Sequence, residues 1–482
     1  MRKEFSVTDA DSKQERLLRL LEAVFGPGDA TNPQDRARES SRGFVRGLDL
    51  LTFDESPKAT GRRLTPIEAL NAYGMRTLYE VVVDGSAIIS ANQAAAGKVL
   101  RERRTQLDLP RRTVASKTGL APEVIDALER SSRRPVREYE RVARVLGLDE
   151  RSISFRPVPE GNERVAVRLR SLAEDSPSLS PSSVANLAEA AWVAMTQIRL
   201  ETELDLYNSI HFEHSSDYGF GRPAYTAGYE LADRFRRDLG LGRSPIPSMR
   251  QLAEVRLGIP VIQAQLDEHI AGATIESSGR RAIVLNIDGL NGDALVRRST
   301  MAHEIGHLVF DPSQRLEDLR VDEYGELEQR PDTRADPVEQ RANAFAVQLL
   351  APQDEAVDRY NADHDLFSSV LDYFGVSFTA GRYQVWNGLG RSLRLEDIRA
   401  PNRRPEPDWD ARESFTLTYH PIRELARRPS RAGRFSAVVI RSAKEGLISW
   451  DTASEWLHCS EQEARDSIGA MTDLYVEVFR DT

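Results

Sequence analysis

The sequence predicts a mainly α-helical protein with a small β-sheet, an α+β fold, and three features support this prediction. Residues 93–148 form a row of segments whose apolar residues recur three and four positions apart, with breaks at proline, glycine or serine, which indicates short helices. Residues 271–288 contain two strand-like runs on either side of Ser-Ser-Gly, which indicates a β-hairpin. The segment "MAHEIGHLVF" (301–310) predicts a further helix with an apolar side.

The length of the chain predicts several domains. At 482 residues it exceeds the size at which a single hydrophobic core stops growing. Changes in composition and turn-rich breaks suggest the boundaries. We expect an N-terminal extension of unassigned role that is partly helical (1–92), an all-helical domain (93–150), a linker with a connector helix (151–219), an α+β domain (220–398) and a C-terminal helical region (399–482).

Within the N-terminal extension the pattern predicts two helices. "ERLLRLLEAVF" (15–25) has helical spacing, and "TPIEALNAYGMRTLYEVV" (65–82) begins with Thr65 and Glu68 in the spacing of a capping box. Between them, "GPGDATNPQDRARESSRG" (26–43) is rich in turn-forming residues, and we expect a loose segment there.

The composition is that of a soluble globular protein, with 40% hydrophobic and 29% charged residues. No run approaches ~18 uncharged apolar residues, so we expect no membrane-spanning helix. The N-terminal residues are acidic and polar where a secretion signal would be apolar. A single cysteine, Cys459, excludes an intramolecular disulfide framework and a thiolate-rich zinc site. These features predict a cytoplasmic protein that does not bind membranes.

Positive charge is concentrated in the all-helical domain. The formal net charge of the chain is −10, whereas residues Lys98 to Leu148 carry 13 lysines and arginines against 7 acidic residues, a local charge of +6. The overall acidity argues against a protein that coats nucleic acid along its whole surface. One basic segment in an acidic chain instead indicates one anion-binding module beside a second module of different function.

The segment 301–310 carries a candidate metal site. His303 and His307 are four residues apart, so on a helix their side chains share one face and can reach one ion at the ~2.0–2.1 Å of a zinc–nitrogen bond. Glu304 would lie beside that ion, where it can accept a proton from water whose pKa the metal lowers towards ~7. This spacing predicts a catalytic Zn²⁺ site, and the alternative is a surface helix with two solvated histidines.

The third ligand must come from elsewhere in the chain, because a catalytic zinc site normally has three protein ligands and one water. The position six residues after His307, where one class of such sites has its third histidine, is Ser313. Glu339, on a predicted helix 32 residues downstream of His307, is our candidate, and Asp311 is the rival. Asn343, one turn after Glu339, could hydrogen-bond a zinc-ligating histidine or tie the two helices together.

Three motifs in order give the chain a family resemblance. "RRAIVLN" is followed by "RRSTMAHEIGHLVF" and then by E-x-x-A-N-x-F-A-x-x-L-L-A-P, which starts at Glu339. Over roughly residues 225–395 the sequence resembles the ImmA/IrrE family of bacterial and phage metallopeptidases. The resemblance implies a gluzincin-like domain in which His303, His307 and Glu339 bind Zn²⁺ and Glu304 is the general base. It also implies a narrow protein substrate, typically a transcriptional repressor, whose cleavage switches on a stress, mobile-element or defence response.

An acidic insertion lies between the two motif helices. Residues 311–337 contain nine acidic residues against four arginines. The simpler interpretation is a solvated loop. The other is an acidic rim or flap that favours a basic substrate or covers the active-site cleft.

The basic segment 97–148 resembles a helix-turn-helix domain of the XRE type. Ala115 would let the two crossing helices approach each other, and Gly119 would form the turn between them. The resemblance implies that the helix from Pro122 to Arg130 lies in the major groove of DNA.

The same resemblance implies DNA contacts by Arg111, Arg112 and Lys117, which would face phosphates and contribute salt-dependent affinity. Glu123 and Asp126 are acidic at exposed positions of the reading helix, where a carboxylate can accept from cytosine but repels phosphate. A protein-binding or dimerising domain and a merely solvated basic face therefore stay open as alternatives.

Other candidate groups have simpler interpretations. His211 and His214 are three residues apart, but we expect them to be loop or helix-end histidines. The arginines of residues 423–435 could contact nucleic acid, although we expect a solvated linker face there. Cys459 is expected to be an ordinary thiol.

Together these features predict a cytoplasmic two-module regulator in which a DNA-binding domain is coupled to a zinc endopeptidase that cleaves a repressor protein. The alternative is a non-catalytic DNA-binding regulator that uses the metallopeptidase fold as a sensor, and a protein-interaction scaffold is a third possibility. Glu304 argues against the sensor, because a sensor needs metal ligands but no general base. Whether the chain forms a homodimer stays open.

Overall fold

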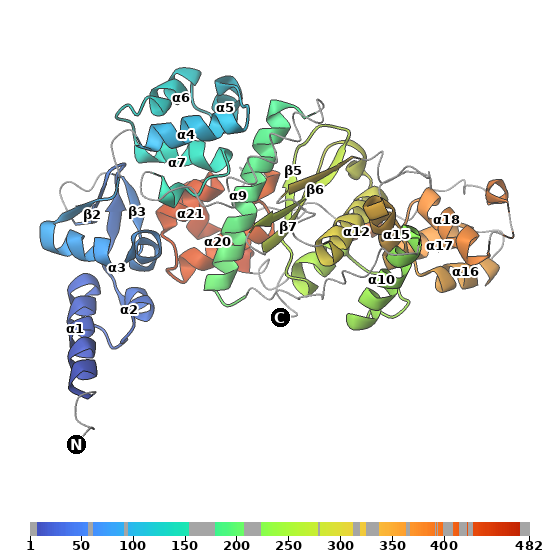
Figure 1. Ribbon diagram of the computed structural model, residues 1–482, viewed down its shortest axis with the longest axis horizontal. Helices are drawn as coiled ribbons and strands as arrows, with labels where there is room; N and C mark the ends of the chain where they lie inside the picture. The colour runs from blue at the N-terminus through green and yellow to red at the C-terminus, as the bar shows by residue number, and fades with distance from the viewer. Residues whose placement is uncertain are drawn as a thin grey trace. The chain divides into compact units, whose positions relative to one another are not determined.

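The computed structural model divides the chain into two compact units. The first unit comprises residues 1–166, 199–205 and 420–476, and the second comprises residues 167–198, 206–419 and 477–482. The predicted fold class is confirmed, since the chain is mainly α-helical, although its described strands form two small sheets instead of one (Figure 1). The structure describes residues 7–55, 61–90, 95–153, 179–206, 223–277, 280–311, 319–323, 337–362, 367–390, 392, 394–398, 408–413, 422 and 428–472.

The first unit contains an antiparallel sheet that was not predicted from the sequence. Its strand order is β3-β1-β2-β4, and Phe44 lies opposite both Phe53 and Leu64. The strands have only three or four residues, which is too short for alternation of apolar and polar residues to be visible. Their bounds are Phe44–Arg46 (β1), Leu50–Phe53 (β2), Arg62–Leu64 (β3) and Ser86–Ile88 (β4).

Three helices share a hydrophobic core with this sheet. The expectation of a loose segment at 26–43 is wrong, because the second helix lies within it. Asn32 caps that helix by accepting a hydrogen bond from the Asp35 N–H, and Pro33 occupies the first turn, so the turn-forming residues mark a helix start. The three helices are α1 (Val7–Phe25), α2 (Pro33–Glu39) and α3 (Pro66–Asp84).

The helix α3 begins as predicted, with the Thr65 side chain accepting a hydrogen bond from the Glu68 N–H. The Glu68 carboxylate reaches beyond its own helix. It accepts hydrogen bonds from the Ser449 N–H at 3.1 Å and from the Thr452 hydroxyl at 2.6 Å. This predicted capping residue therefore connects α3 to the C-terminal helices of the same unit.

Four short helices occupy the segment that the sequence predicted to be all-helical. Val114, Ala115 and Ile125 are buried in this segment. Gly119 has a φ of 69° at the turn between the second and third helices, a left-handed conformation that glycine adopts without steric cost. The elements are α4 (Ala95–Gln106), α5 (Arg111–Thr118), α6 (Pro122–Glu129), α7 (Val136–Val145) and the 3₁₀ turn η1 (Glu150–Ser152).

The C-terminal residues complete the first unit. Their arginine-rich run does not form the expected solvated face, because Arg431 and Arg434 are only 1% and 4% exposed. Arg434 pairs with both carboxylate oxygens of Glu201, at 2.7 and 3.1 Å, which compensates the cost of burying its charge. Residues 423–427 of the run lie outside the described residues. The elements here are η6 (Pro429–Arg431), α20 (Arg434–Lys444), α21 (Trp450–Leu457) and α22 (Glu461–Asp466).

A buried cluster of charges lies inside the first unit. Arg46 of β1 donates to Glu140 of α7 at 2.9 Å, and Arg62 of β3 lies 3.5 Å from the same carboxylate oxygen. Glu150 lies 3.7 Å from Arg62 and accepts a hydrogen bond from the indole N–H of Trp456 at 2.6 Å. The cluster therefore links the sheet, the short helices and the C-terminal helices.

The second unit contains the predicted hairpin within a four-stranded sheet of order β5-β7-β6-β8. The strands β6 and β7 are antiparallel, whereas β5 is parallel to β7. The strand β8 lies in the acidic insertion, which is therefore more than a solvated loop; residues 312–318 and 324–336 of the insertion lie outside the described residues. The strands are β5 (Val261–Ala264), β6 (Ile270–Ser277), β7 (Arg280–Asn286) and β8 (Leu319–Glu323).

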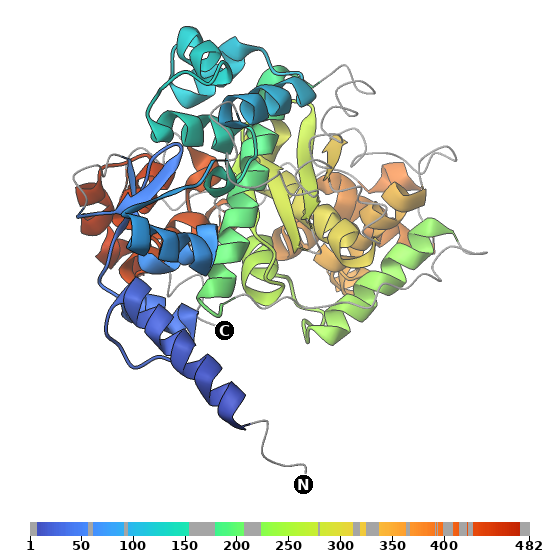
Figure 2. The same ribbon diagram turned by 60° about the vertical axis from the view of Figure 1, so that its left-hand side comes forward.

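The helix α9 (Pro181–Glu203), which belongs to the second unit up to residue 198 and to the first unit from residue 199, lies alongside this sheet, as both views show (Figure 1 and Figure 2). Asn186 of α9 donates to the Gln265 carbonyl, just after β5, at 2.5 Å. Within the described residues, every helix is too short or too polar to cross a membrane. The other elements of the second unit are α10 (Ala224–Asp238), α11 (Met249–Gln251), the π-helical turn η2 (Leu252–Arg256), η3 (Gly289–Gly292), α12 (Ala294–Phe310), α15 (Pro337–Leu350), α16 (Gln353–Ala362), α17 (Phe367–Phe374), α18 (Phe378–Gly388), η4 (Leu395–Asp397) and α19 (Asp408–Arg412).

The substitution Glu140→Ala should strongly destabilise the first unit. It leaves Arg46 and Arg62 buried without the carboxylate that they share, and removing one partner of a buried ion pair typically costs ~3–5 kcal/mol. Chemical denaturation measures this change in the free energy of unfolding. The control Glu80→Ala removes an exposed pair with Arg76 and should leave that free energy nearly unchanged. Equal effects of the two substitutions would contradict the prediction.

Candidate metal centre

The helix α12 carries the H-E-x-x-H motif in the interior of the second unit. Its apolar residues Ile305 and Leu308 belong to the hydrophobic core. His303, Glu304 and His307 are also fully buried. The alternative of a surface helix with two solvated histidines is therefore wrong.

The helix α15 brings Glu339 to this motif by packing against both α12 and α10. Small residues permit the close approach of the three helices. A Cβ atom at Gly306 of α12 would lie 2.8 Å from the ring of Phe345, and one at Gly228 of α10 would overlap the carbonyl oxygen of Arg341. Both glycines therefore let helices approach at a distance that a larger residue would prevent.

Three side chains that can ligate a metal converge where α12 and α15 meet. The Nε2 atoms of His303 and His307 lie 2.9 Å apart. Glu339 has one carboxylate oxygen 3.3 Å from Nε2 of His303 and the other 3.5 Å from Nε2 of His307. Donor atoms bound to one zinc ion at ~2.0–2.2 Å in tetrahedral geometry lie roughly 3.4 Å apart, so these three side chains fit a single metal ion.

The other ring nitrogen of each histidine is held by a second side chain. Nδ1 of His303 lies 2.9 Å from Oδ1 of Asn343, and Nδ1 of His307 lies 2.7 Å from Oδ2 of Asp311. Because amide and carboxylate oxygens only accept hydrogen bonds, each Nδ1 carries the hydrogen and each Nε2 presents a lone pair. Two lone pairs and a carboxylate then face one another, an arrangement that a cation between them stabilises.

Asp311, the rival third ligand, lies behind His307, on the side of the ring away from Glu339. Its other carboxylate oxygen pairs with the guanidinium of Arg341 on α15. Burial lowers the pKa of Arg341, which stays cationic because guanidinium groups titrate far above neutral pH. Arg341 and Asp311 thus orient His307, an arrangement typical of zinc-ligating histidines. Arg341 was not predicted from the sequence, where its one signal is its position two residues after Glu339.

The carboxylate of Glu304 lies beside the strand β6. A Cβ atom at Gly272 of β6 would lie 2.8 Å from Oε1 of Glu304. One turn earlier in α12, Thr300 donates to Asn291 at 2.9 Å, and Asn291 donates to the Ala271 carbonyl of β6 at 2.7 Å. Gly272, Asn291 and Thr300 were not predicted from the sequence, because their importance depends on contacts between separate segments.

The residues predicted to contact DNA lie on α5 and α6 of the first unit. Arg112 and Glu123 are exposed, and Lys117 is half-buried. Arg111 is engaged within its own domain, where its guanidinium lies 2.7 Å from the carboxylate of Glu129. Arg111 is therefore less available to a phosphate than the sequence suggests.

The sequence offered two further candidates, a histidine pair and the cysteine. His211 and His214 lie outside the described residues. Burial raises the pKa of the Cys459 thiol to about 12, so this thiol is protonated at neutral pH and is a weak nucleophile.

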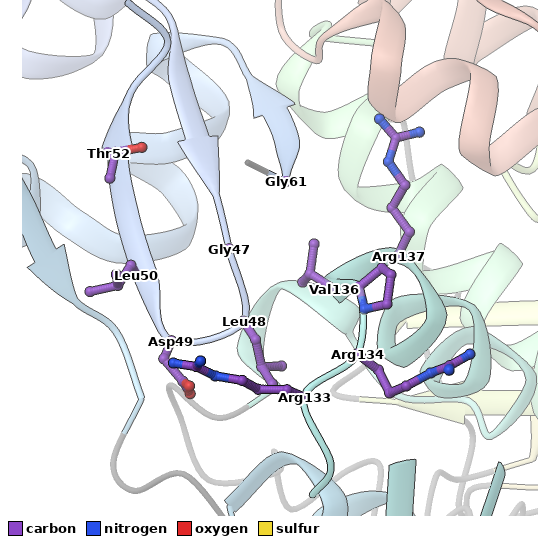
Figure 3. A pocket seen from close by; sticks show the side chains of 11 residues that line it. Gly47, Leu48, Asp49, Leu50, Thr52, Gly61, Arg133, Arg134, Val136 and Arg137 are labelled. Carbon is purple, nitrogen blue, oxygen red and sulfur yellow. The ribbon is translucent and has the colours of Figure 1, made fainter. Parts of the chain in front are cut away.

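A cavity of about 640 Å³ lies within the first unit, between the β1–β2 turn and the start of α7 (Figure 3). Three arginines line it, but carboxylates of the same unit hold two of them. Arg134 lies 2.7 Å from Glu138, and Arg137 lies 2.7 Å from Asp451. Figure 3 shows the side chains of these two residues and of Arg133 extending in different directions. The three guanidinium groups therefore do not point towards one common position, and the cavity does not define an anion site.

The part of the chain around the metal centre matches a known protein family. The model of a peptidase family, the IrrE N-terminal-like domain, matches residues 255–385, a range that contains His303, Glu304, His307 and Glu339. No curated protein matched the chain. The match indicates a metallopeptidase-type domain of the ImmA/IrrE family in this range, in agreement with the resemblance seen in the sequence. The buried cluster of two histidines and one glutamate is compatible with a metal ion.

The substitution Asp311→Ala should weaken zinc binding about 10–100-fold without abolishing it, because it lets His307 rotate but removes no ligand. Glu339→Ala, which removes a ligand, should cause a much larger loss. Competition with a chelator measures both affinities on the full-length chain. Asp354→Ala, which removes an exposed carboxylate paired with Arg243, is the control. Equal losses for Asp311→Ala and Glu339→Ala would make Asp311 a ligand.

Proposed function

We propose that the second unit is a zinc-dependent endopeptidase that cleaves a specific protein substrate. The observation that carries this proposal is the convergence of His303, His307 and Glu339 on one point, with Glu304 buried next to them in the same helix as the histidines. Two imidazoles and one carboxylate are typical of catalytic zinc sites, which keep a further position for water or substrate. The match to a peptidase family supports the same reaction.

The residues of the site divide the work of peptide hydrolysis. The three ligands would hold Zn²⁺, which supplies the Lewis acidity that polarises a carbonyl group and acidifies water. Glu304 accepts the proton of the attacking water and donates it to the amine that leaves when the peptide bond breaks. Asn343 and Asp311 keep the imidazoles oriented through their Nδ1 atoms. Burial of the site lowers its local dielectric and so strengthens these interactions.

We propose further that the substrate is a transcriptional repressor and that the reaction takes place in the cytoplasm, where cleavage switches on a stress, mobile-element or defence response. The family match supports the repressor, because the ImmA/IrrE resemblance implies substrates of this kind. The alternative of a non-catalytic sensor is less favoured. A sensor needs the metal ligands, but it gives no reason to keep the carboxylate of Glu304 fully buried beside them at a cost in solvation.

The purified full-length chain should contain about one zinc per chain by elemental analysis. Glu304→Gln should retain the metal, because Glu304 is not a ligand, whereas Glu339→Ala should lose most of it. To identify the substrate, the enzyme is added to an extract of the source cell. Mass spectrometry then detects the new protein N termini that cleavage creates. Wild type should generate a small set of termini that Glu304→Gln does not, since a general base contributes about 10²–10⁴-fold to the rate.

The control outcomes separate the competing functions. Zinc without new termini in the wild type would favour the sensor, and a wild type without zinc would contradict the metal centre. Full zinc retention in Glu339→Ala would assign the third ligand to another residue.

We also propose that the helices α4–α7 bind DNA, with Arg112 and Lys117 facing phosphates. Arg112 is exposed on α5, and the basic charge of this segment supports an anionic partner. Arg111 would contribute less, because Glu129 already engages it. The acidic Glu123 at the start of α6 would bias base contacts towards cytosine.

The substitution Arg112→Ala should weaken DNA binding to all sequences alike and reduce the slope of log affinity against log salt by about 1. Fluorescence anisotropy at several salt concentrations measures both. Arg76→Ala removes an exposed arginine of α3, outside the proposed interface, and should have no effect. If the wild type does not bind DNA, the segment is instead a protein-binding or dimerising domain, and sedimentation then tests for a homodimer.

A further inference from the structure

Gly272 lies where the backbone of β6 passes close to the carboxylate of Glu304. A Cβ atom at this position would lie 2.8 Å from Oε1 of Glu304 and 3.0 Å from the carbonyl oxygen of Val284. Both distances are shorter than van der Waals contacts between carbon and oxygen, so a methyl group here forces a displacement. Gly272 is not among the glycines with positive φ, so its backbone conformation does not require glycine. Glycine is required instead because the space beside the Glu304 carboxylate is too small for a Cβ atom.

The strand is irregular at the same position. The pairing of β6 with β8 shifts register between Ile270 and Gly272. Glycines and bulges within strands mark points where another group approaches the backbone closely. At this point that group is the Glu304 carboxylate.

Two buried asparagines fix the backbone of β6 here. Asn286 donates to the Ile270 carbonyl at 2.8 Å, and Asn291 donates to the Ala271 carbonyl at 2.7 Å. Thr300 donates to Oδ1 of Asn291 at 2.9 Å, which joins the network to α12. Both asparagines and Thr300 are fully buried, so water does not compete for these hydrogen bonds. Strand and helix are thereby held at one separation.

We propose that Gly272 is a positioning residue for the proton acceptor of the site. It leaves the space in which the Glu304 carboxylate lies, and the network of Asn286, Asn291 and Thr300 keeps that space constant. The consequence for catalysis rests on the proposed peptidase function, whereas the placement of the carboxylate does not.

The response to an added methyl group follows from the two atoms it would meet most closely, since the third, Cγ2 of Thr300, lies at 3.4 Å, close to ordinary contact. The Val284 carbonyl belongs to the backbone of the central strand β7, which is paired on both sides. The Glu304 carboxylate is the end of a side chain with three rotatable bonds, so it is the group that moves. A misplacement of ~1 Å in a reacting group costs on the order of 10²-fold in rate. The three atoms nearest to the added methyl group belong to Glu304, Val284 and Thr300, and none of these residues is a metal ligand.

The placement is tested by a double-mutant cycle on the thermal unfolding of the zinc-loaded, full-length chain. Gly272→Ala should lower Tm by roughly 2–4 °C. In the Glu304→Ala background, where the carboxylate is absent, the same substitution should lower Tm much less. Equal shifts in the two backgrounds would overturn the proposal. If Gly272→Ala alone does not fold, the proposal requires that the double variant, Gly272→Ala with Glu304→Ala, does fold.

The catalytic consequence is tested with the cleavage-site peptide identified from the new N termini. Gly272→Ala should lower kcat on the order of 10²-fold, with KM and zinc content unchanged. It should add little to the loss caused by Glu304→Gln, because both act on the same carboxylate. The matched control is Gly292→Ala, where an added Cβ atom meets nothing within 4 Å, and this variant should keep the wild-type Tm and kcat.

The two measurements distinguish failure of this inference from failure of the proposed function. Coupled Tm shifts in a chain that cleaves nothing would support the placement of Glu304 and contradict the peptidase. Cleavage by the wild type with an unchanged kcat in Gly272→Ala would overturn the positioning role. Loss of zinc from Gly272→Ala would overturn it as well, because Gly272 would then support the metal ligands themselves.

Discussion

Two imidazole nitrogens and a carboxylate, held within 3.5 Å of one another by buried helices, repel each other unless a cation lies between them. The second unit has to hold these groups together against that repulsion. Part of the work is done by packing, since Gly306 and Gly228 let α12 and α10 approach α15 closely. The rest is done by Asn343 and Asp311, whose oxygens fix the outward ring nitrogens. A site organised in this way loses little conformational entropy when an ion binds.

Much of the centre could be predicted from local spacing. The separation of His303 and His307 determines that they share a helix face. Glu339 was one of two candidate carboxylates, and its role as a ligand, with Asn343 one turn after it, came from the family resemblance of the next motif helix. Asp311 shows where such reasoning ends. Its spacing from His307 puts it within reach of that imidazole but does not decide which ring nitrogen it contacts. In the structure Asp311 contacts Nδ1, the nitrogen that faces away from Glu339.

The parts that could not be predicted depend on contacts between distant segments. The strands of the first unit are too short to show a period, and although β1 and β2 pair across a short turn, the pairings of β1 with β3 and of β2 with β4 join strands farther apart in the sequence. Arginines pose the same difficulty. Arg434 was expected to be solvated because its neighbours are basic, yet its partner Glu201 is 233 residues away. A charged side chain can be buried only with such a partner, and the residues next to the arginine in the sequence do not indicate where that partner is.

The first unit is assembled from residues 1–166, a short internal segment at 199–205 and residues 420–476, with most of the second unit encoded between them. Residues 206 to 427 must be synthesised before the C-terminal helices can reach Glu68 and Glu150, an interval of roughly 10–45 s at ~5–20 residues per second. The metal-centre helices leave the ribosome within that interval. The helices of the metal centre are therefore available to pack before the first unit has all of its residues, although that unit has the earlier start in the sequence.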